Sequence, residues 1–427
     1  MAQNIKNKHK VLIVAPFWGK QNHVGIYRVE RFIKWLSSEG YSVVVLKASF
    51  KNEIKETKWG LEISVKDGIG KISDFFIRTS TKVKTKVFSY LWYALVLIFS
   101  PVDTYFYWSQ KVRLSKLLNN YIKNINFIIA SSPPSSSLIA AYSISKNHNI
   151  PLIVDMRDGW LDEPLISGLK KKGIRKAIEG RLEKNILSHS AKIFLTSSLW
   201  GQKITERLPQ VKNKITILTN AYPEFDFRTS SSISIFERSS FDIKLLYAGR
   251  FTGSSYLRKS DILLRPLFNV LQVRKNPVEL LLLSNLKRNY IKSLDSWKSR
   301  FEKIGCKLSN IPQVKRRKMF DFIANSSGLL LLSTGQAPLP SKTFEYIKST
   351  KPILAVTPKG STVWEIGQNL HQMFLYDYTA EKTDLTPVEK FLDACNTGDY
   401  KYNIPDEYSE EYLSKIFMDT IKNVEFM

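Results

Sequence analysis

Cysteine is nearly absent from this sequence, whose 427 residues include only Cys306 and Cys395. Two cysteines so far apart provide no disulfide framework, and no Cys/His spacing in the chain matches a zinc site. Histidine is also scarce, and of the five histidines only His23 lies in a candidate ligand-binding loop. The composition therefore excludes a small disulfide-stapled domain and a zinc domain, and it fits a reducing cytoplasm.

Long hydrophobic runs are absent as well. Residues 1–10 are polar and basic, without the apolar run and cleavage site of a signal peptide, so we expect the chain to stay in the cytoplasm. The apolar segment 88–100 is shorter than the roughly 20 residues that span a bilayer. Within 82–108, lysines precede this segment and aromatic residues follow it. Two interpretations stay open: a peripheral contact with anionic lipid at the inner face of the plasma membrane, or a buried helix beside solvated lysines.

Acidic residues are few relative to basic ones, since 64 Lys and Arg against 38 Asp and Glu give a formal net charge of +26. A surface of this charge attracts phosphate-bearing partners, which include nucleic acid, anionic lipid and nucleotide-sugar diphosphates. A compositional bias toward Lys, Asn, Ile and Ser also produces a basic balance. The charge alone selects no partner.

Short aliphatic runs alternate with amphipathic stretches, which is typical of βαβ units around a buried parallel sheet. The runs that predict strands are 11–15, 42–47, 126–130, 151–155, 192–195, 216–218, 243–248, 278–283, 328–332, 352–356 and 373–376. After the first strand, apolar residues recur at helical spacing from Val24 until Gly40 ends the helix. The fold class expected is α/β with doubly wound sheets.

The length is too great for one compact α/β core, so we expect two domains. The first covers residues 1–220. The second begins at 221, where residues 220–240 carry serines, phenylalanines and a proline with no sustained period, as in a connection. Open α/β domains bind ligands outside the carboxyl ends of their strands, so a tandem pair predicts a cleft between them.

The loop between the first strand and the first helix is one candidate site. Gly19 and Gly25 allow close approach of the backbone, and Arg28 follows in the helix. A turn of this kind aims helix amides at an anion. A purely structural turn is the alternative, because the three-glycine dinucleotide fingerprint is missing.

Two further segments follow predicted strands of the first domain. Residues 130–137 combine serines and prolines, and helix capping is enough to explain them. Residues 155–160 read Asp-Met-Arg-Asp-Gly-Trp and include Asp155 and Asp158. Such a charged cluster at a strand end is costly unless it is solvated, paired or used in binding, and we favour its use.

In the second domain, Gly249 and Arg250 end a strand, and Lys259 belongs to a basic segment, 258–261, that opens the next helix. An arginine fork and a lysine point charge suit a diphosphate, and a solvated basic loop is the alternative.

The sharpest pattern is Pro-Leu-Pro-Ser-Lys-Thr-Phe-Glu-Tyr at 338–346. Ser341 is expected to cap a helix whose free amides face a phosphate, and Lys342 adds charge. Glu345 lies in the first turn, where its carboxylate binds hydroxyl groups or only interacts with the helix dipole.

These landmarks, in this order, resemble the family-4 glycosyltransferases of the GT-B fold over nearly the whole chain, most closely a subgroup with a Ser-Lys-x-Phe-Glu-Tyr stretch. The resemblance implies two Rossmann-like domains that face each other across a cleft, with 221–404 binding a nucleotide-sugar and 405–427 forming a helix that packs back across the junction. The donor-binding residues it implies are Gly249, Arg250, Lys259, Ser341, Lys342, Thr343 and Glu345. In the family, the Arg and Lys grip the diphosphate and the Glu binds the ribose. The catalytic residues expected are Asp158, Arg250 and Lys259, and the acceptor-side or phosphate-loop residues expected are Gly19, Arg28 and Asp155.

Two positions depart from the family pattern. A second Glu that contacts the transferred sugar is replaced by Ala337, so Gln336 or backbone amides near Pro338 would take over its contact. Many members carry a His within the segment that here reads Met-Arg-Asp, and the acceptor-side role passes to Asp158.

The resemblance implies sugar transfer with retention of configuration, and it implies neither a metal nor another cofactor. The sequence agrees on the metal, since no Asp-x-Asp pair stands where a sugar diphosphate would need one, and basic residues would neutralise its charge. The acceptor it implies is a bacterial cell-envelope glycan or its lipid carrier. Nucleotide-sugar 2-epimerases share this fold but need carboxylates and histidines in the cleft, and a nucleic-acid-binding protein fits only the charge.

Overall fold

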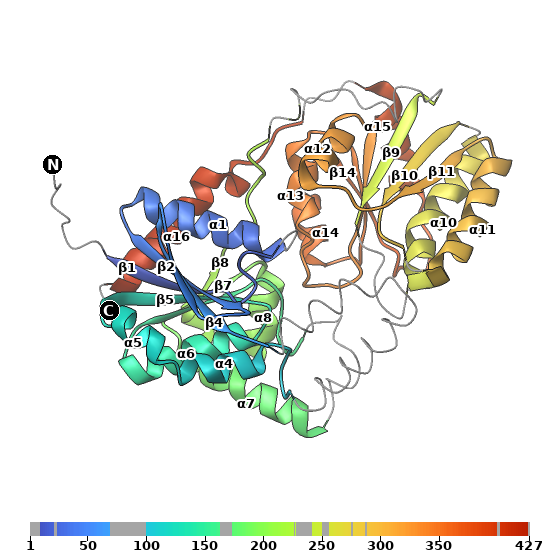
Figure 1. Cartoon of the computed structure of the whole chain (residues 1–427). Helices are drawn as coiled ribbons and strands as arrows, with labels where there is room; N and C mark the ends of the chain where they lie inside the picture. Colours follow the sequence, from blue (N-terminus) through green and yellow to red (C-terminus); the bar gives the residue numbers. More distant parts are fainter. Residues whose placement is uncertain are drawn as a thin grey trace. The chain divides into compact units, whose positions relative to one another are not determined.

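A computed structural model describes residues 9–20, 24–68, 100–162, 173–225, 227, 241–249, 256–274, 276–286, 288–398 and 402–425. The chain forms two compact units, the first from Met1–Thr219 and Leu413–Met427 and the second from Asn220–Tyr412. Each unit is a mainly parallel β-sheet covered by helices (Figure 1). The predicted fold class is confirmed for both halves of the chain.

The first sheet has eight described strands in the order β3-β4-β2-β1-β5-β6-β7-β8. Their bounds are β1 Lys10–Val14, β2 Ser42–Ser49, β3 Glu53–Thr57, β4 Gly60–Lys66, β5 Ile125–Ser132, β6 Leu152–Met156, β7 Lys192–Leu195 and β8 Ile215–Ile217. The β3–β4 pair is antiparallel, and the other pairs are parallel. Since β1 lies between β2 and β5, the strand order reverses there, and this is where a doubly wound sheet binds ligands.

The helices of the first unit cover this sheet. They are α1 Val24–Ser38, α4 Phe106–Arg113, α5 Lys116–Ile122, α6 Ser136–His148, α7 Gly173–His189, α8 Ser198–Arg207 and the C-terminal α16 Glu410–Glu425, with a 3-10 turn at Pro209–Lys214. Gly40, with φ +85°, follows α1 and takes the left-handed conformation expected after a helix. The last helix belongs to this core, because the ring of Phe417 stacks 4.7 Å from Phe32 and 5.6 Å from Phe194.

The segment predicted to contact a membrane is described only from Ser100 onward. Tyr105 and Trp108, two of the aromatic residues that follow the apolar segment, are 3% and 0% exposed and pack in the core of the first unit. These two side chains fit the buried alternative, and residues 82–99 lie outside the described residues. Within the described parts of the chain, no helix has the length and apolar character needed to cross a bilayer.

The second sheet has six described strands, all parallel, in the order β11-β10-β9-β12-β13-β14. The bounds are β9 Ile243–Ala248, β10 Val278–Leu283, β11 Lys307–Ile311, β12 Gly328–Leu332, β13 Ile353–Val356 and β14 Met373–Tyr376. In chain order this is 3-2-1-4-5-6, the Rossmann arrangement, with its switch point between β9 and β12. The intervening helices are α10 Tyr256–Arg274, α11 Arg288–Lys303, α12 Arg316–Ala324, α13 Lys342–Lys348, α14 Thr362–Gly367 and α15 Thr386–Thr397.

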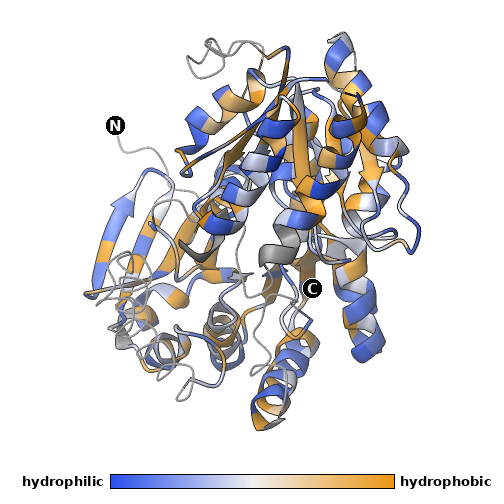
Figure 2. Cartoon of the chain, turned by 90° about the vertical axis from the view of Figure 1, so that its right-hand side faces the viewer, coloured by the Kyte–Doolittle hydropathy of each residue, from blue (hydrophilic) through white to orange (hydrophobic). Residues whose placement is uncertain are grey.

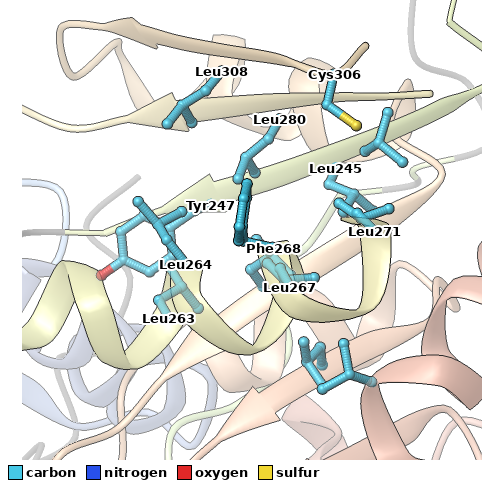
Figure 3. Close-up of a cluster of buried hydrophobic side chains, with 14 of the residues drawn as sticks. Leu245, Tyr247, Leu263, Leu264, Leu267, Phe268, Leu271, Leu280, Cys306 and Leu308 are labelled. Carbon is cyan, nitrogen blue, oxygen red and sulfur yellow. The ribbon is translucent and has the colours of Figure 1, made fainter. Parts of the chain in front are cut away.

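Apolar layers form on both faces of the second sheet. On one face, side chains of α10 such as Leu264 and Phe268 pack against Leu245 of β9 and Leu280 of β10 (Figure 3). The other face packs against α12 and α13. Figure 2 shows the consequence, with predominantly hydrophobic strands between helices that are hydrophilic on their outer sides. A sheet buried on both faces produces the continuous aliphatic runs that are visible in the sequence.

Candidate functional site

The carboxyl edge of the second sheet, at the switch point between β9 and β12, is the place where this arrangement binds ligands. Strand β9 ends at Ala248, and Gly249 follows it. A Cβ at Gly249 would lie 2.5 Å from the hydroxyl oxygen of Tyr247, so glycine is the residue this position accepts. Arg250 lies outside the described residues, and Lys259 is placed on α10 without a described side chain.

A buried hydrogen bond joins this strand end to α13. The amide of Ala248 donates to the hydroxyl oxygen of Tyr346 at 3.0 Å, and Tyr346 is fully buried. Burial raises the pKa of the Tyr346 phenol, so the hydroxyl stays protonated. The bond holds α13, whose first turn carries Glu345, at the end of β9.

Glu345 is the centre of a charged cluster. Its side chain is nearly buried, and its Oε1 accepts hydrogen bonds from Arg316 Nε at 3.1 Å and Nη2 at 3.0 Å. Its Oε2 accepts a hydrogen bond from Lys342 Nζ at 2.8 Å. Two cations therefore orient one carboxylate, which satisfies the requirement that a buried charge be paired. Arg316 was not among the predicted site residues, although the Lys-Arg-Arg-Lys run at 315–318 was a signal of positive charge.

Ser341 and Thr343 were also predicted to bind the donor, and the structure shows what each side chain contacts. Ser341 has helical backbone angles and its side chain makes no capping bond, so the predicted capping role is wrong. The amide of Thr343 donates to the carbonyl of Pro340 at 3.0 Å. The hydroxyl of Thr343 is buried and has no hydrogen-bond partner within the part of the chain that the structure describes.

The loop before α13 contains Ala337, which replaces the second glutamate of the family pattern, and Gln336, a candidate to take over its contact with the sugar. Ala337 is 1% exposed, and its carbonyl accepts a hydrogen bond from the Thr362 hydroxyl at 3.0 Å. The neighbouring Gln336 has an exposed side chain. Of these two positions, only Gln336 presents a side chain to solvent.

In the first unit, the switch point between β1 and β5 places the Gly19 loop at the carboxyl edge. Gly19 has φ +80°, which only glycine adopts readily. Trp18 Nε1 donates to Glu62 Oε1 at 2.9 Å, and the Lys47 ammonium bonds to the other oxygen of Glu62. Burial raises the pKa of Glu62, but the bonds from Lys47 and Trp18 outweigh it and hold the pKa below its usual value. Strand β4 thus anchors the loop.

Arg28 and Asp155 form a buried pair, 4% and 0% exposed. Arg28 Nη2 lies 2.7 Å from Asp155 Oδ1, and Ser131 Oγ donates to Oδ2 at 2.8 Å. The remaining donors of Arg28 bond to the carbonyls of Leu218 and Thr219, each at 2.9 Å. Both charges are buried and paired with each other, and this gives the pair a structural role that ties α1, β6 and the end of β8 together.

Arg157 and Asp158 follow β6, and Arg157 lies near the first turn of α1. Arg157 Nε donates to the carbonyl of Ser132 at 3.2 Å, and its guanidinium lies 5.0 Å from the centre of the Phe17 ring. A Cβ at Gly25 would lie 2.3 Å from Arg157 Nη1, so the glycine predicted to allow close approach admits this arginine. Burial raises the pKa of Asp158, Arg157 opposes the rise, and Asp155 adds to it.

A raised pKa makes the Asp158 carboxylate a better proton acceptor than an ordinary aspartate. Among the described residues, no group of three or more His, Cys, Asp or Glu side chains is arranged to hold a metal ion. The metal-independent reaction expected from the sequence stays a prediction.

No family model matches this chain, and no curated protein matches its sequence. Solved structures do match it. Sucrose-phosphate synthase from Thermosynechococcus elongatus has a TM-score of 0.66 at 10% identity, over 98% of this chain and 99% of that chain. The UDP-forming trehalose-phosphate synthase from Burkholderia vietnamiensis has a TM-score of 0.58 at 9% identity, over 98% and 100%. A structure named as a putative UDP-N-acetylglucosamine 2-epimerase from Listeria monocytogenes has a TM-score of 0.54 at 10% identity, over 97% and 96%.

The similarity extends over nearly the full length of this chain and of each solved structure. At such low identity it establishes the fold. The chain has the GT-B fold, with one Rossmann-like sheet in each unit.

Proposed function

We propose that this protein is a glycosyltransferase that moves a sugar from a UDP-sugar to an acceptor, and that the donor binds at the carboxyl edge of the second sheet. The observation that carries the proposal is the oriented carboxylate of Glu345, held by Arg316 and Lys342 beside the end of β9. A fixed, negatively charged acceptor suits a pair of vicinal hydroxyls such as those of ribose. Two of the similar structures carry UDP or a UDP-sugar in their names, which favours uridine as the base.

In this proposal the second unit supplies the groups that stabilise the leaving diphosphate. Arg250 and Lys259 neutralise its charge, so the reaction needs no metal. Gly249 lets the backbone approach the diphosphate, and the buried hydroxyl of Thr343 gains a hydrogen-bond partner when the donor binds. Lys342 contributes charge and orients Glu345, and the exposed Gln336 contacts the transferred sugar.

The first unit supplies the acceptor side. Asp158, with its raised pKa, takes the proton from the acceptor hydroxyl, and Gly19 lines the acceptor loop beside Lys47. Transfer proceeds with retention of configuration, so the acceptor oxygen bonds to the anomeric carbon on the face from which the diphosphate leaves, and the bond to UDP breaks. We propose a cell-envelope glycan or a lipid-linked glycan as the acceptor, in keeping with the family that the sequence resembles.

The test is to incubate the protein with a panel of UDP-sugars and follow UDP release together with formation of a glycosylated product. Glu345→Gln should lower UDP release at a given donor concentration, because the neutral amide binds hydroxyls less strongly. Glu302→Gln, at an exposed glutamate near the carboxyl end of α11, is the matched control and should behave as wild type. Conversion of UDP-N-acetylglucosamine to its 2-epimer without a glycosylated product would instead identify an epimerase, which the Listeria similarity allows.

A further inference from the structure

The carboxylate of Glu345 is held by cations from two helices. Lys342 begins α13, three residues before Glu345, and Arg316 begins α12. Both helices pack on the same face of the second sheet (Figure 1). The Glu345 side chain is 5% exposed, and those of Arg316 and Lys342 are 29% and 28% exposed. The carboxylate is therefore the most enclosed of the three charges.

The two oxygens of this carboxylate are used unequally. An ionised carboxylate accepts about four hydrogen bonds, two at each oxygen. Oε1 of Glu345 already accepts two, from Nε and Nη2 of Arg316 at 3.1 and 3.0 Å. Oε2 accepts one, from Nζ of Lys342 at 2.8 Å. Within the described part of the chain Glu345 accepts no further side-chain hydrogen bond, so one acceptor position remains, and it is on Oε2.

The guanidinium of Arg316 is itself fixed. Its central carbon lies 5.0 Å from the centre of the Phe320 ring, one turn further along α12. The ring attracts the cation, and the planar arginine fork loses little freedom for each hydrogen bond it donates. Arg316 therefore keeps Oε1 occupied, instead of exchanging between the two carboxylate oxygens.

We propose that Glu345 accepts a single hydroxyl of the donor's ribose, at Oε2, and that Arg316 is the positioning residue that limits it to one by occupying Oε1. A carboxylate with both oxygens open would accept both vicinal hydroxyls, one at each oxygen. With Oε1 filled, the site distinguishes the 2′-hydroxyl from the 3′-hydroxyl. This inference rests on the proposed donor site, since it concerns how that site binds ribose.

The test is calorimetric titration of UDP, 2′-deoxy-UDP and 3′-deoxy-UDP into the full chain. The penalty for removing a hydroxyl is the Kd of the deoxy nucleotide divided by that of UDP. In the wild type, we expect one hydroxyl to carry a penalty of about tenfold or more, as for a lost hydrogen bond to a charged group. In Glu345→Gln this penalty should fall to about threefold, while the penalty for the other hydroxyl should not change.

Arg316→Met opens Oε1 to the second hydroxyl. The preference of the site, which is the ratio of the two penalties, should therefore fall by at least about threefold. Arg316→Lys provides only one donor direction toward Oε1, so its preference should lie between those of the wild type and Arg316→Met. This second variant decides the question if urea unfolding shows that Arg316→Met does not fold. The matched control is Arg317→Met, because Arg317 is an exposed neighbour on α12 whose guanidinium lies 4.4 Å from the Phe225 ring. It should keep the wild-type preference.

Two results would overturn the inference. If both penalties fall together in Glu345→Gln, Glu345 accepts both hydroxyls. If the Arg316 variants weaken all three nucleotides by the same factor and leave the preference unchanged, Arg316 has only a structural role. Either result leaves the proposed donor site intact, because UDP still binds there, whereas failure of UDP to bind the wild type would refute the donor site and this inference together.

Discussion

Breaking the buried pair of Arg28 and Asp155 tests the structural role assigned to it. Arg28→Met keeps much of the side-chain volume but leaves Asp155, which is 0% exposed, with Ser131 as its described partner. Removing one member of a buried ion pair costs about 3–5 kcal/mol. We expect the upper part of that range, because the carbonyls of Leu218 and Thr219 also lose a donor.

The assay is urea unfolding followed by tryptophan fluorescence, which reports mainly on the first unit because seven of the nine tryptophans lie there. A double variant, Arg28→Met/Asp155→Leu, removes both charges and should cost at least about 2 kcal/mol less than the sum of the two single variants. Arg113→Met, at an exposed arginine on α4, is the control and should lie within about 0.5 kcal/mol of wild type. A loss below about 1 kcal/mol for Arg28→Met, or strictly additive single variants, would refute the structural role.

Three further perturbations test packing, titration and the bond at the end of β9. Gly328→Ala should destabilise the second unit by about 1–3 kcal/mol, because the new Cβ would lie 2.3 Å from the sulfur of Cys395, and Cys395→Ala should restore part of the loss. Burial and, to a lesser extent, neighbouring lysines lower the pKa of His189 in the folded protein. Folding therefore favours the neutral ring, and the stability this gives is complete above the ordinary pKa of about 6.5 and is lost as the pH falls below it. Urea midpoints measured down to pH 5 should fall less steeply for His189→Gln than for the wild type; equal slopes would contradict the shift. Tyr346→Phe leaves the amide of Ala248 without its partner and should cost about 1–3 kcal/mol and weaken UDP binding, and unchanged stability would show that the bond contributes little.

The strands buried on both faces were predictable from the sequence. The predicted strands at 192–195, 243–248, 278–283, 328–332 and 373–376 are confirmed with the same bounds, because strands inside a parallel sheet consist of continuous apolar runs. Three described strands were not predicted: β4, Gly60–Lys66, which is only partly buried and lies between β3 and β2, and two strands at sheet edges. Strand β3, Glu53–Thr57, is largely exposed and polar, and β11, Lys307–Ile311, is buried only in part, so neither carries a continuous apolar signal.

The site was predictable only where its residues are close in sequence. The position of Glu345 in the first turn of α13 follows from the local pattern and is confirmed. Its partner Arg316 comes from another helix, and Arg28 lies 127 positions from Asp155, so no local pattern could pair them. Ser341 failed as a cap because the chain already has helical angles at that residue.

Calorimetric titration of UDP into the wild type, Glu345→Gln and the Glu302→Gln control shows whether the donor binds at the carboxyl edge of the second sheet. We expect UDP to bind the wild type and the control alike, and Glu345→Gln to weaken binding by about 1.5–3 kcal/mol, as when a hydrogen bond to a charged group is lost. Unfolding midpoints of the three proteins, measured in parallel, show whether Glu345→Gln remains folded. If UDP does not bind the wild type, or if it binds folded Glu345→Gln as tightly as the control, the donor site is not at the carboxyl edge of the second sheet.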